Sequence, residues 1–508
     1  MVSLRSTSLI KRNIMANFAG QGWAALMGFI FVPFFLKFIG AEGYGLVGFF
    51  VLLSATMGLL DGGLGATATR QTAAFIEADH EGKAATVALI RMIEAFFWLV
   101  AALIGVAVAL AAPLIATQWL KVENIRIPEV TVALRLMAAA LVVQFPIAFY
   151  SGCLVGFQQQ VTLNIINSVS ATLRGIGAVL VLWLIAPTVQ TFFAWQCVLS
   201  FVTVLSLRAS CWRVLGSPSK AKWFDLKALR AVGRFAVGVG GINIFGFLLT
   251  QVDKIILSKI LPLQSFGYYT LAWTLGTFAY RFISPIFNAY YPRITQLAAR
   301  VDQDDFAAGL QQKTELVDVY MKASRVMAIV IVPFSVWLAF FSRELLELWT
   351  RDQAVAQAAA GALALIALGT MCNGFMHIPY GLQLASGWTG LAFWQNFIAV
   401  LLLVPLTYFF AIRYGLTGAA LPWLILNVGY VLISAPLMYK VMLNTAKWNW
   451  YRSSVVFPFL QATCLTGFFY YLSLQFNGSI LVSVLLFSGL FASVAVSTLS
   501  SGLIKIHR

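Results

Sequence analysis

Residues 240–261 read GGINIFGFLLTQVDKIILSKIL. This stretch is apolar and long enough to cross the hydrocarbon core of a membrane, which takes about 20 helical residues. Asp253 and Lys254 stand side by side in its middle. An ionisable group at that depth costs about 2.5–3.5 kcal/mol on insertion scales. A chain that keeps two of them is expected to use them for substrate contact, ion coupling or a buried pair.

The rest of the chain has the same character. Of its 508 residues, 60% are hydrophobic and 10% are charged, whereas a soluble domain has about 25% charged residues. We count about fourteen apolar runs of spanning length, which predicts an all-α integral membrane protein. Most of the 34 lysines and arginines fall in alternate connecting segments, and this bias predicts that both termini are cytoplasmic. The net charge of +16 is therefore a topology signal, and we expect no nucleic-acid partner.

Two stretches of the chain, about 224 positions apart, are similar in sequence. Gly43 and Tyr44 of the first align with Gly267 and Tyr268 of the second. Because six predicted spans separate the two stretches, we expect two parallel, pseudo-symmetric six-helix lobes. Parallel repeats that face each other across an axis along the membrane normal are a transporter design, with the site between the lobes. Duplication without transport, as in a scaffold, is the alternative.

The predicted domain organisation follows from this repeat. It comprises an N-terminal lobe at 1–212, a basic cytoplasmic linker at 213–234, a C-terminal lobe at 235–440, and an appended pair of spans with the C-terminal tail at 441–508.

The sequence also indicates which chemistry to leave aside. It contains no GxxxxGK[ST] phosphate loop, so ATP hydrolysis by that route is not expected, and we predict a protein that is not an enzyme. The acidic residues Asp302, Asp304 and Asp305 could in principle hold a metal ion. We interpret them instead as a solvated loop before a helix, because aspartate favours helix N-termini. No cofactor or metal is expected.

Several motifs resemble those of one family. They are FIGAEGYG at 38–45, LLDGGLGATATR at 59–70, VDKIILSKILPLQSFGYYTLAW at 252–273, YPRITQLAA at 291–299 and YGLTGAALPWLI at 414–425. In this order and spacing they resemble the polysaccharide transporters of the multidrug/oligosaccharidyl-lipid/polysaccharide exporter superfamily. Those proteins are flippases of O-antigen and exopolysaccharide repeat units.

The resemblance implies a function in the bacterial inner membrane. There the protein would move an undecaprenyl-diphosphate-linked oligosaccharide from the inner to the outer leaflet, through a cationic cavity between two lobes that work by alternating access. It implies lipid-linked oligosaccharide and membrane lipids as partners, with a polysaccharide polymerase and a chain-length regulator as further candidates. The appended pair also occurs in the related peptidoglycan-precursor flippases, which keeps that subfamily open. The sequence is also compatible with a drug/cation antiporter of the same superfamily, a lipid scrambler or an integral-membrane polysaccharide polymerase.

Basic residues within the predicted spans are the candidates for binding a diphosphate, since such a group needs compensating positive charge in a low-dielectric cavity. Arg91 could instead pair with Glu94, three positions away on one helical face. Arg135, in the fourth predicted span, could instead extend its side chain to the outer membrane surface. The candidates are Arg174, Lys254, Arg281, Arg91 and Arg135.

Four titratable residues are candidates for coupling transport to a proton or sodium gradient. They are Asp253, Asp61, Glu94 and His377. Asp61 lies in a bend-prone run, so a helix-end or hinge role is equally open, and His377 could be a packed neutral histidine. Asp253 and Lys254 lie about 100° apart on a helix, so we expect two separate partners rather than a local ion pair.

Overall fold

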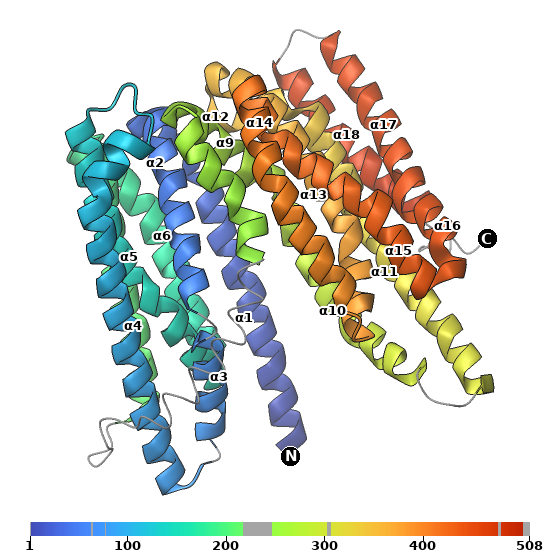
Figure 1. Ribbon diagram of the computed structural model, residues 1–508, viewed down its shortest axis with the longest axis horizontal. Helices are drawn as coiled ribbons and strands as arrows, with labels where there is room; N and C mark the ends of the chain where they lie inside the picture. The colour runs from blue at the N-terminus through green and yellow to red at the C-terminus, as the bar shows by residue number, and fades with distance from the viewer. Residues whose placement is uncertain are drawn as a thin grey trace. The chain divides into compact units, whose positions relative to one another are not determined.

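The computed structural model of the protein describes residues 2–61, 64–76, 78–216, 246–301, 306–475 and 479–500 (Figure 1). These residues are almost entirely helical, and the described part of the chain contains no strand beyond an isolated bridge between Lys121 and Pro262. Nine segments in these ranges are helical, long and apolar enough to cross a membrane. The predicted all-α integral membrane fold is thereby confirmed, while the count of about fourteen spans stays a prediction.

The chain divides into two compact units, Met1–Gly267 and Tyr268–Arg508. The predicted linker at 213–234 lies outside the described residues from 217 onward, so the lobe boundaries drawn from the repeat stay a prediction. The first unit contains α1 (Val2–Ile30), α2 (Val32–Leu60), α3 (Leu64–Phe75), α4 (His80–Leu114), η1 (Ile115–Trp119), α5 (Ile127–Gly156), α6 (Gln160–Leu184), α7 (Val189–Leu215) and a helix over 246–260.

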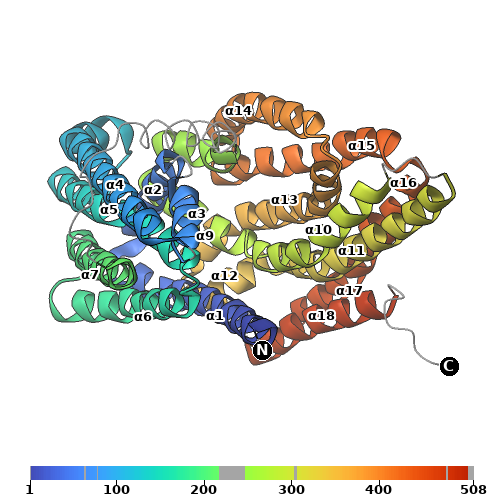
Figure 2. The same cartoon turned by 90° about the horizontal axis from the view of Figure 1, so that it is seen from below.

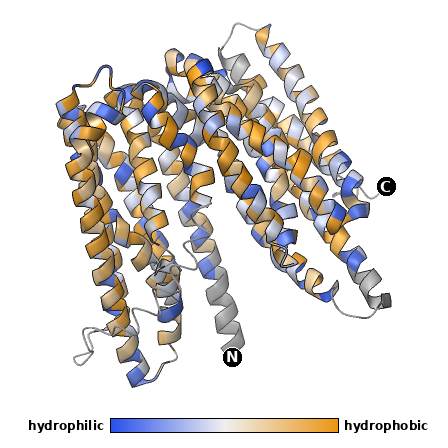
Figure 3. Cartoon of the chain, in the orientation of Figure 1, coloured by the Kyte–Doolittle hydropathy of each residue, from blue (hydrophilic) through white to orange (hydrophobic). Residues whose placement is uncertain are grey.

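Within the first unit, α5 is the central helix. It packs against α3, α4 and α7, while α6 packs against α1 and α7 (Figure 2). The outer helix α4 buries Ile90, Ile93 and Phe97 and exposes Leu103 and Leu110 by 62% and 75%. Figure 3 shows that apolar residues predominate along most of α4. Exposed leucines in such number are the pattern of a helix whose outer face is solvated by lipid.

Local breaks set the positions of several helix ends. The predicted run 45–69 does not form one span, since α2 ends at Leu60 and α3 begins at Leu64. Gly40 interrupts α2 with φ +71, and Gly415 interrupts α14 (Gly390–Gly429) with φ +59. A Cβ added at either glycine would meet no atom within 4 Å, so the left-handed backbone alone favours glycine there.

The two similar stretches of the internal repeat approach each other closely at one glycine of each, Gly45 and Gly267. A Cβ on Gly45 would lie 2.2 Å from the carbonyl oxygen of Leu263, and a Cβ on Gly267 would lie 2.3 Å from the carbonyl oxygen of Ala41. Both distances are far below van der Waals contact, so only glycine permits this backbone approach. The approach explains why the segment 246–267 belongs to the first compact unit.

The second unit is built around α11 and α13, which pack against α10 and against each other. The pair α17 and α18 packs together and against α11, and Trp337 Nε1 on α11 donates to the carbonyl oxygen of Leu486 on α18 at 2.8 Å. Besides α14, the elements of this unit are α10 (Tyr280–Val301), α11 (Phe306–Phe340), α12 (Ser342–Thr350), α13 (Gln353–Ala385), η2 (Tyr430–Ser434), α15 (Ala435–Val441), η3 (Asn444–Ala446), α16 (Lys447–Trp450), η4 (Tyr451–Val456), α17 (Phe457–Leu474) and α18 (Ser479–Ser500), while α9 (Leu263–Gly276) begins in the first unit.

Candidate functional site

The candidate residues fall into two sets, one in each compact unit, and each set is described by itself. Asp61, Arg91, Glu94, Arg135, Arg174, Asp253 and Lys254 belong to the first unit, and Arg281 and His377 belong to the second.

Glu94 is the centre of a polar network that joins three helices. Its side chain projects from α4, and the residue is 8% exposed. Oε1 of Glu94 accepts from the Tyr150 hydroxyl on α5 at 2.5 Å, from Arg208 Nε on α7 at 2.6 Å and from Trp212 Nε1 at 3.4 Å. Trp98 Nε1 donates to the Tyr150 hydroxyl at 3.3 Å. Three donors, one of them cationic, therefore satisfy this buried carboxylate from two neighbouring helices.

The network corrects the alternative that Arg91 pairs with Glu94. The carboxylate faces α5 and α7, where Arg208 reaches it, and the Arg91 guanidinium lies over the ring of Trp212 at 5.3 Å instead. Hydropathy alone assigns Arg208 to the basic loop after the sixth predicted span and gives Tyr150 no role. The sequence signal that could have predicted this network is Glu94 itself, because a glutamate inside an apolar run needs a basic partner, which can come from another helix.

Arg174 lies near the middle of α6 and is half-buried. Within the described ranges no ion pair or hydrogen bond of its guanidinium is found, whereas four other basic side chains have carboxylate partners there. The two glycines that follow at close spacing let neighbouring helices approach, because Gly175 contacts Phe31 and Gly177 contacts Trp195. The result is a cation held at membrane depth between packed helices.

Asp253 and Lys254 form a local ion pair, which their spacing on the helix had not led us to expect. Lys254 Nζ lies 3.3 Å from Oδ1 of Asp253 and donates to the carbonyl oxygen of Thr250 at 2.6 Å. Their side chains are 8% and 12% exposed, respectively. The angular separation of neighbours on a helix does not prevent the pair, because the four-carbon stem of lysine is long and flexible enough to reach back.

Asp61, Arg135 and Arg281 lie at less enclosed positions. Oδ1 of Asp61 accepts from the backbone N–H of Gly65 at 3.2 Å, where α2 gives way to α3, which is the geometry of a helix-end role. Arg135 is exposed on α5, and Arg281 is exposed in the first turn of α10, just after a break at 277–279 in the predicted eighth span.

The second unit contains a chain of neutral polar side chains that the search for charged residues in the sequence missed. The Tyr280 hydroxyl donates to Oδ1 of Asn373 at 2.8 Å, and Asn373 Nδ2 donates to Oδ1 of Asn427 at 2.7 Å. Asn427 Nδ2 donates in turn to the carbonyl oxygen of Trp423. His377 joins the chain, since its Nδ1 lies 3.1 Å from the carbonyl oxygen of Asn373. The sequence signal that could have predicted this hydrogen-bonded chain is the presence of asparagine side chains inside the predicted spans.

Two further predictions fall on undescribed positions. Asp302, Asp304 and Asp305 lie outside the described residues, as does most of the predicted basic linker.

Comparison with known proteins gives two family matches. The model of a family described as polysaccharide biosynthesis protein matches residues 10–298, and the MatE family model matches residues 240–409. The chain is also similar to a Shigella flexneri protein named "Putative O-antigen transporter". The two are 21% identical over 422 residues, which is 82% of this chain and 94% of that protein.

Solved structures with a similar fold include two kinds of transporter. The lipid II flippase MurJ, in an inward closed conformation, superposes with a TM-score of 0.63 at 14% identity, over 96% of this chain and 98% of that one. An inward-facing MATE multidrug resistance transporter of the MOP superfamily gives a TM-score of 0.63 at 13% identity, over 84% of this chain and 96% of that one. Nearly the whole of this chain therefore has a counterpart in the fold of the lipid II flippase.

Proposed function

The chain belongs to the polysaccharide biosynthesis protein family, and we propose that it carries a lipid-linked oligosaccharide across the bacterial inner membrane. This membership confirms the resemblance read from the motifs, and the protein is a polysaccharide transporter of the multidrug/oligosaccharidyl-lipid/polysaccharide exporter superfamily. The proposed cargo is an undecaprenyl-diphosphate-linked repeat unit for O-antigen or exopolysaccharide. The proposed action is transfer from the inner to the outer leaflet without chemical change.

The way in which charges are compensated in the first unit is the observation that supports an anionic cargo. The carboxylates of Glu94 and Asp253 each have a basic partner, whereas Arg174 has no ion pair in the described part of the chain. A transporter of cationic drugs would need a carboxylate available to its cargo. A half-buried arginine instead offers a planar fork that matches the oxygens of a diphosphate.

The proposed mechanism is alternating access. The diphosphate approaches Arg174 and the other basic candidates from the cytoplasmic side, while the polyprenyl tail stays in lipid. Two negative charges that leave a negative cytoplasm gain about 4–5 kcal/mol at 100 mV, which favours export. Asp253 is our candidate for coupling to a cation gradient, so Asp253→Asn is expected to abolish transport, and full activity of this variant would favour a passive scrambler.

The test uses a strain that lacks its own repeat-unit flippase. Arg174→Gln should lower surface polysaccharide at least about tenfold, because a lost charge-assisted hydrogen bond is worth about 1.5–3 kcal/mol. Lys254→Gln should also stop export. The matched control is Arg213→Gln, an exposed arginine of the same unit, with the amount of membrane-inserted protein measured by immunoblot. Wild-type polysaccharide in both Arg174→Gln and Lys254→Gln would contradict the proposal.

A second candidate cargo is the peptidoglycan lipid precursor, and the match to the lipid II flippase over 96% of the chain favours considering it. Both cargoes carry a polyprenyl diphosphate, so the charge argument applies equally. Depletion of the host lipid II flippase separates them. Rescue of growth by this chain would establish the second candidate, and rescue of surface polysaccharide alone would establish the first.

A further inference from the structure

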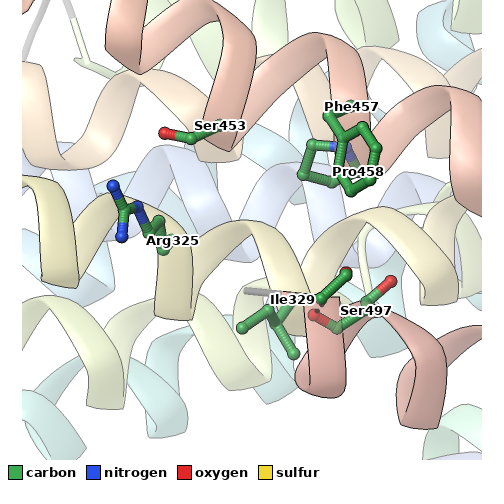
Figure 4. Close-up of a pocket in the computed structure, with 7 residues that line it drawn as sticks. Arg325, Ile329, Ser453, Phe457, Pro458 and Ser497 are labelled. Carbon is green, nitrogen blue, oxygen red and sulfur yellow. Dashed lines mark hydrogen bonds between the residues drawn. The ribbon is translucent and has the colours of Figure 1, made fainter. Parts of the chain in front are cut away.

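A cavity of about 220 Å³ lies within the second unit, where α17 and α18 pack against α11. Figure 4 shows Arg325 and Ile329 of α11 on one side of it and Ser453, Phe457 and Pro458 on the other. Ser497 and Ser500 of α18 complete the lining. The cavity therefore lies at the junction between the appended pair and the rest of the unit.

Two polar groups that line the cavity have unmet hydrogen-bonding capacity. Nε of Arg325 is buried and has no acceptor among the described residues, and no carboxylate there pairs with its guanidinium. Oγ of Ser497 is likewise without a partner, and the residue is 2% exposed. A buried donor without an acceptor costs about 1–3 kcal/mol, and more when it is charged. A ligand that supplies acceptors would remove this cost.

The lining suits an oxyanion attached to an apolar body. Arg325 offers a cationic fork, and the serines offer hydroxyls, while no lining residue carries a negative charge. Ile329 and Phe457 provide an apolar wall beside these donors. Pockets that enclose drug-sized ligands measure about 300–1,000 Å³, so this smaller cavity fits a phosphate headgroup and not an oligosaccharide.

The position of the cavity along the helices indicates lipid as the source of the phosphate. Arg325 and Ser453 lie at the beginnings of predicted spans, and Ser500 lies at the end of another, all on the side predicted to be cytoplasmic. Lys322, one turn before Arg325, and Arg452, next to Ser453, are exposed and add positive charge at this level. Basic residues at a membrane surface attract anionic lipids of the inner leaflet.

We propose that the cavity between α11, α17 and α18 binds the phosphate of an anionic phospholipid of the inner leaflet. Arg325 donates hydrogen bonds to two phosphate oxygens, and the Ser497 hydroxyl donates to the phosphate as well. The bound lipid thereby holds the appended pair, α17 and α18, against α11. Ser453 is contributed by the π-helical turn η4, an element that is frequent at functional sites. This site is separate from the proposed transport of lipid-linked oligosaccharide and does not depend on it.

The experiment uses the delipidated full-length protein in detergent and phosphate-free buffer. Thermal unfolding and native mass spectrometry are followed with phosphatidylglycerol, with diacylglycerol of the same chains, and with inorganic phosphate. Phosphatidylglycerol should remain bound and raise the Tm, and Arg325→Gln should weaken its binding about tenfold. Arg343→Gln, an exposed arginine on α12 beyond the other end of α11, should leave that affinity unchanged.

Three results would overturn the proposal. Diacylglycerol could stabilise the protein as well as phosphatidylglycerol, which would leave the phosphate without a role. Arg325→Gln could bind phosphatidylglycerol like the wild type. Inorganic phosphate could bind the wild type with no added gain from the lipid, which would identify a soluble anion as the ligand. If Arg325→Gln does not fold, Arg325→Lys and Ser497→Ala replace it, and both are expected to weaken lipid binding.

Discussion

Arg208 Nε donates to Oε1 of Glu94 over 2.6 Å, and this bond ties α7 to α4 through a carboxylate that is almost fully buried. Tyr150 on α5 donates to the same oxygen. The interior of the first unit therefore contains a charged junction of three helices, which we expect to stabilise the protein whether or not it also contacts cargo.

Replacing this carboxylate should destabilise the protein. Glu94→Ala leaves Arg208 and Tyr150 without their acceptor, and the free energy of unfolding should fall by about 2 kcal/mol, a value reduced because the Arg208 side chain is 49% exposed. Denaturant unfolding of the purified protein measures the loss. The control is Glu129→Ala, which removes an i,i+3 pair whose arginine is 83% exposed and should cost about 0.5 kcal/mol or less. Equal losses in the two variants would contradict the structural role of Glu94.

The close backbone approach at Gly45 and Gly267 predicts a steric effect. Alanine at either position would place Cβ within 2.3 Å of a carbonyl oxygen, so the helices must move apart, and overpacking of this kind costs about 1–3 kcal/mol. We expect a lower Tm and less surface polysaccharide for Gly45→Ala and Gly267→Ala. Gly58→Ala is the control, since a Cβ there meets no atom within 4 Å. A normal Tm in both test variants would show that the approach is not required.

Asn427 in the second unit should contribute to stability through its two hydrogen bonds. Asn427→Leu has a side chain of similar shape but leaves the Asn373 amide without its acceptor and removes the additional bond to the Trp423 carbonyl, which should cost about 1–3 kcal/mol. Thr407→Val on the same helix is the matched control. Its hydroxyl is fully buried and has no hydrogen-bond partner in the part of the chain that the structure describes, so its removal should cause no loss. Thermal unfolding of the two variants compares the effects, and a stable Asn427→Leu protein would contradict the prediction.

Glu344 on α12, outside the spanning segments, should make stability depend on pH. Burial raises the pKa of this carboxyl, whose Oε2 has no hydrogen-bond partner among the described residues. The folded protein then holds the proton more tightly than the unfolded chain. Stability is therefore full below the unfolded pKa and falls as the pH rises through the folded pKa.

Glu344→Gln removes that loss. The variant should be more stable than the wild type by about 1 kcal/mol at pH 8 and no more stable at pH 4, as measured by the Tm at each pH. A difference that does not change with pH would show that the carboxyl does not titrate in this way.

The sequence predicted the helical membrane fold because composition is a direct consequence of a lipid solvent. It predicted single contacts less well, as the pairs around Arg91 and Lys254 illustrate. Spacing on one helix suggested Arg91 with Glu94 and disfavoured Lys254 with Asp253, yet the structure pairs Glu94 with Arg208 and joins Lys254 to its neighbour. The first result depends on a residue 114 positions away along the chain. The second depends on how far a flexible lysine side chain can reach, and the angle between neighbouring residues on a helix does not account for that reach.

The sequence by itself determined that this chain is an all-helical membrane protein of the polysaccharide transporter family, since apolar runs and ordered motifs require no knowledge of packing. Only the tertiary structure decided which charges are compensated. Glu94 and Asp253 have basic partners, whereas Arg174 has no ion pair in the described part of the chain. It also revealed the cavity beside Arg325. The physical reason is that burial and pairing depend on which helices lie side by side, and that arrangement is set by side-chain packing across the whole unit rather than by any local pattern.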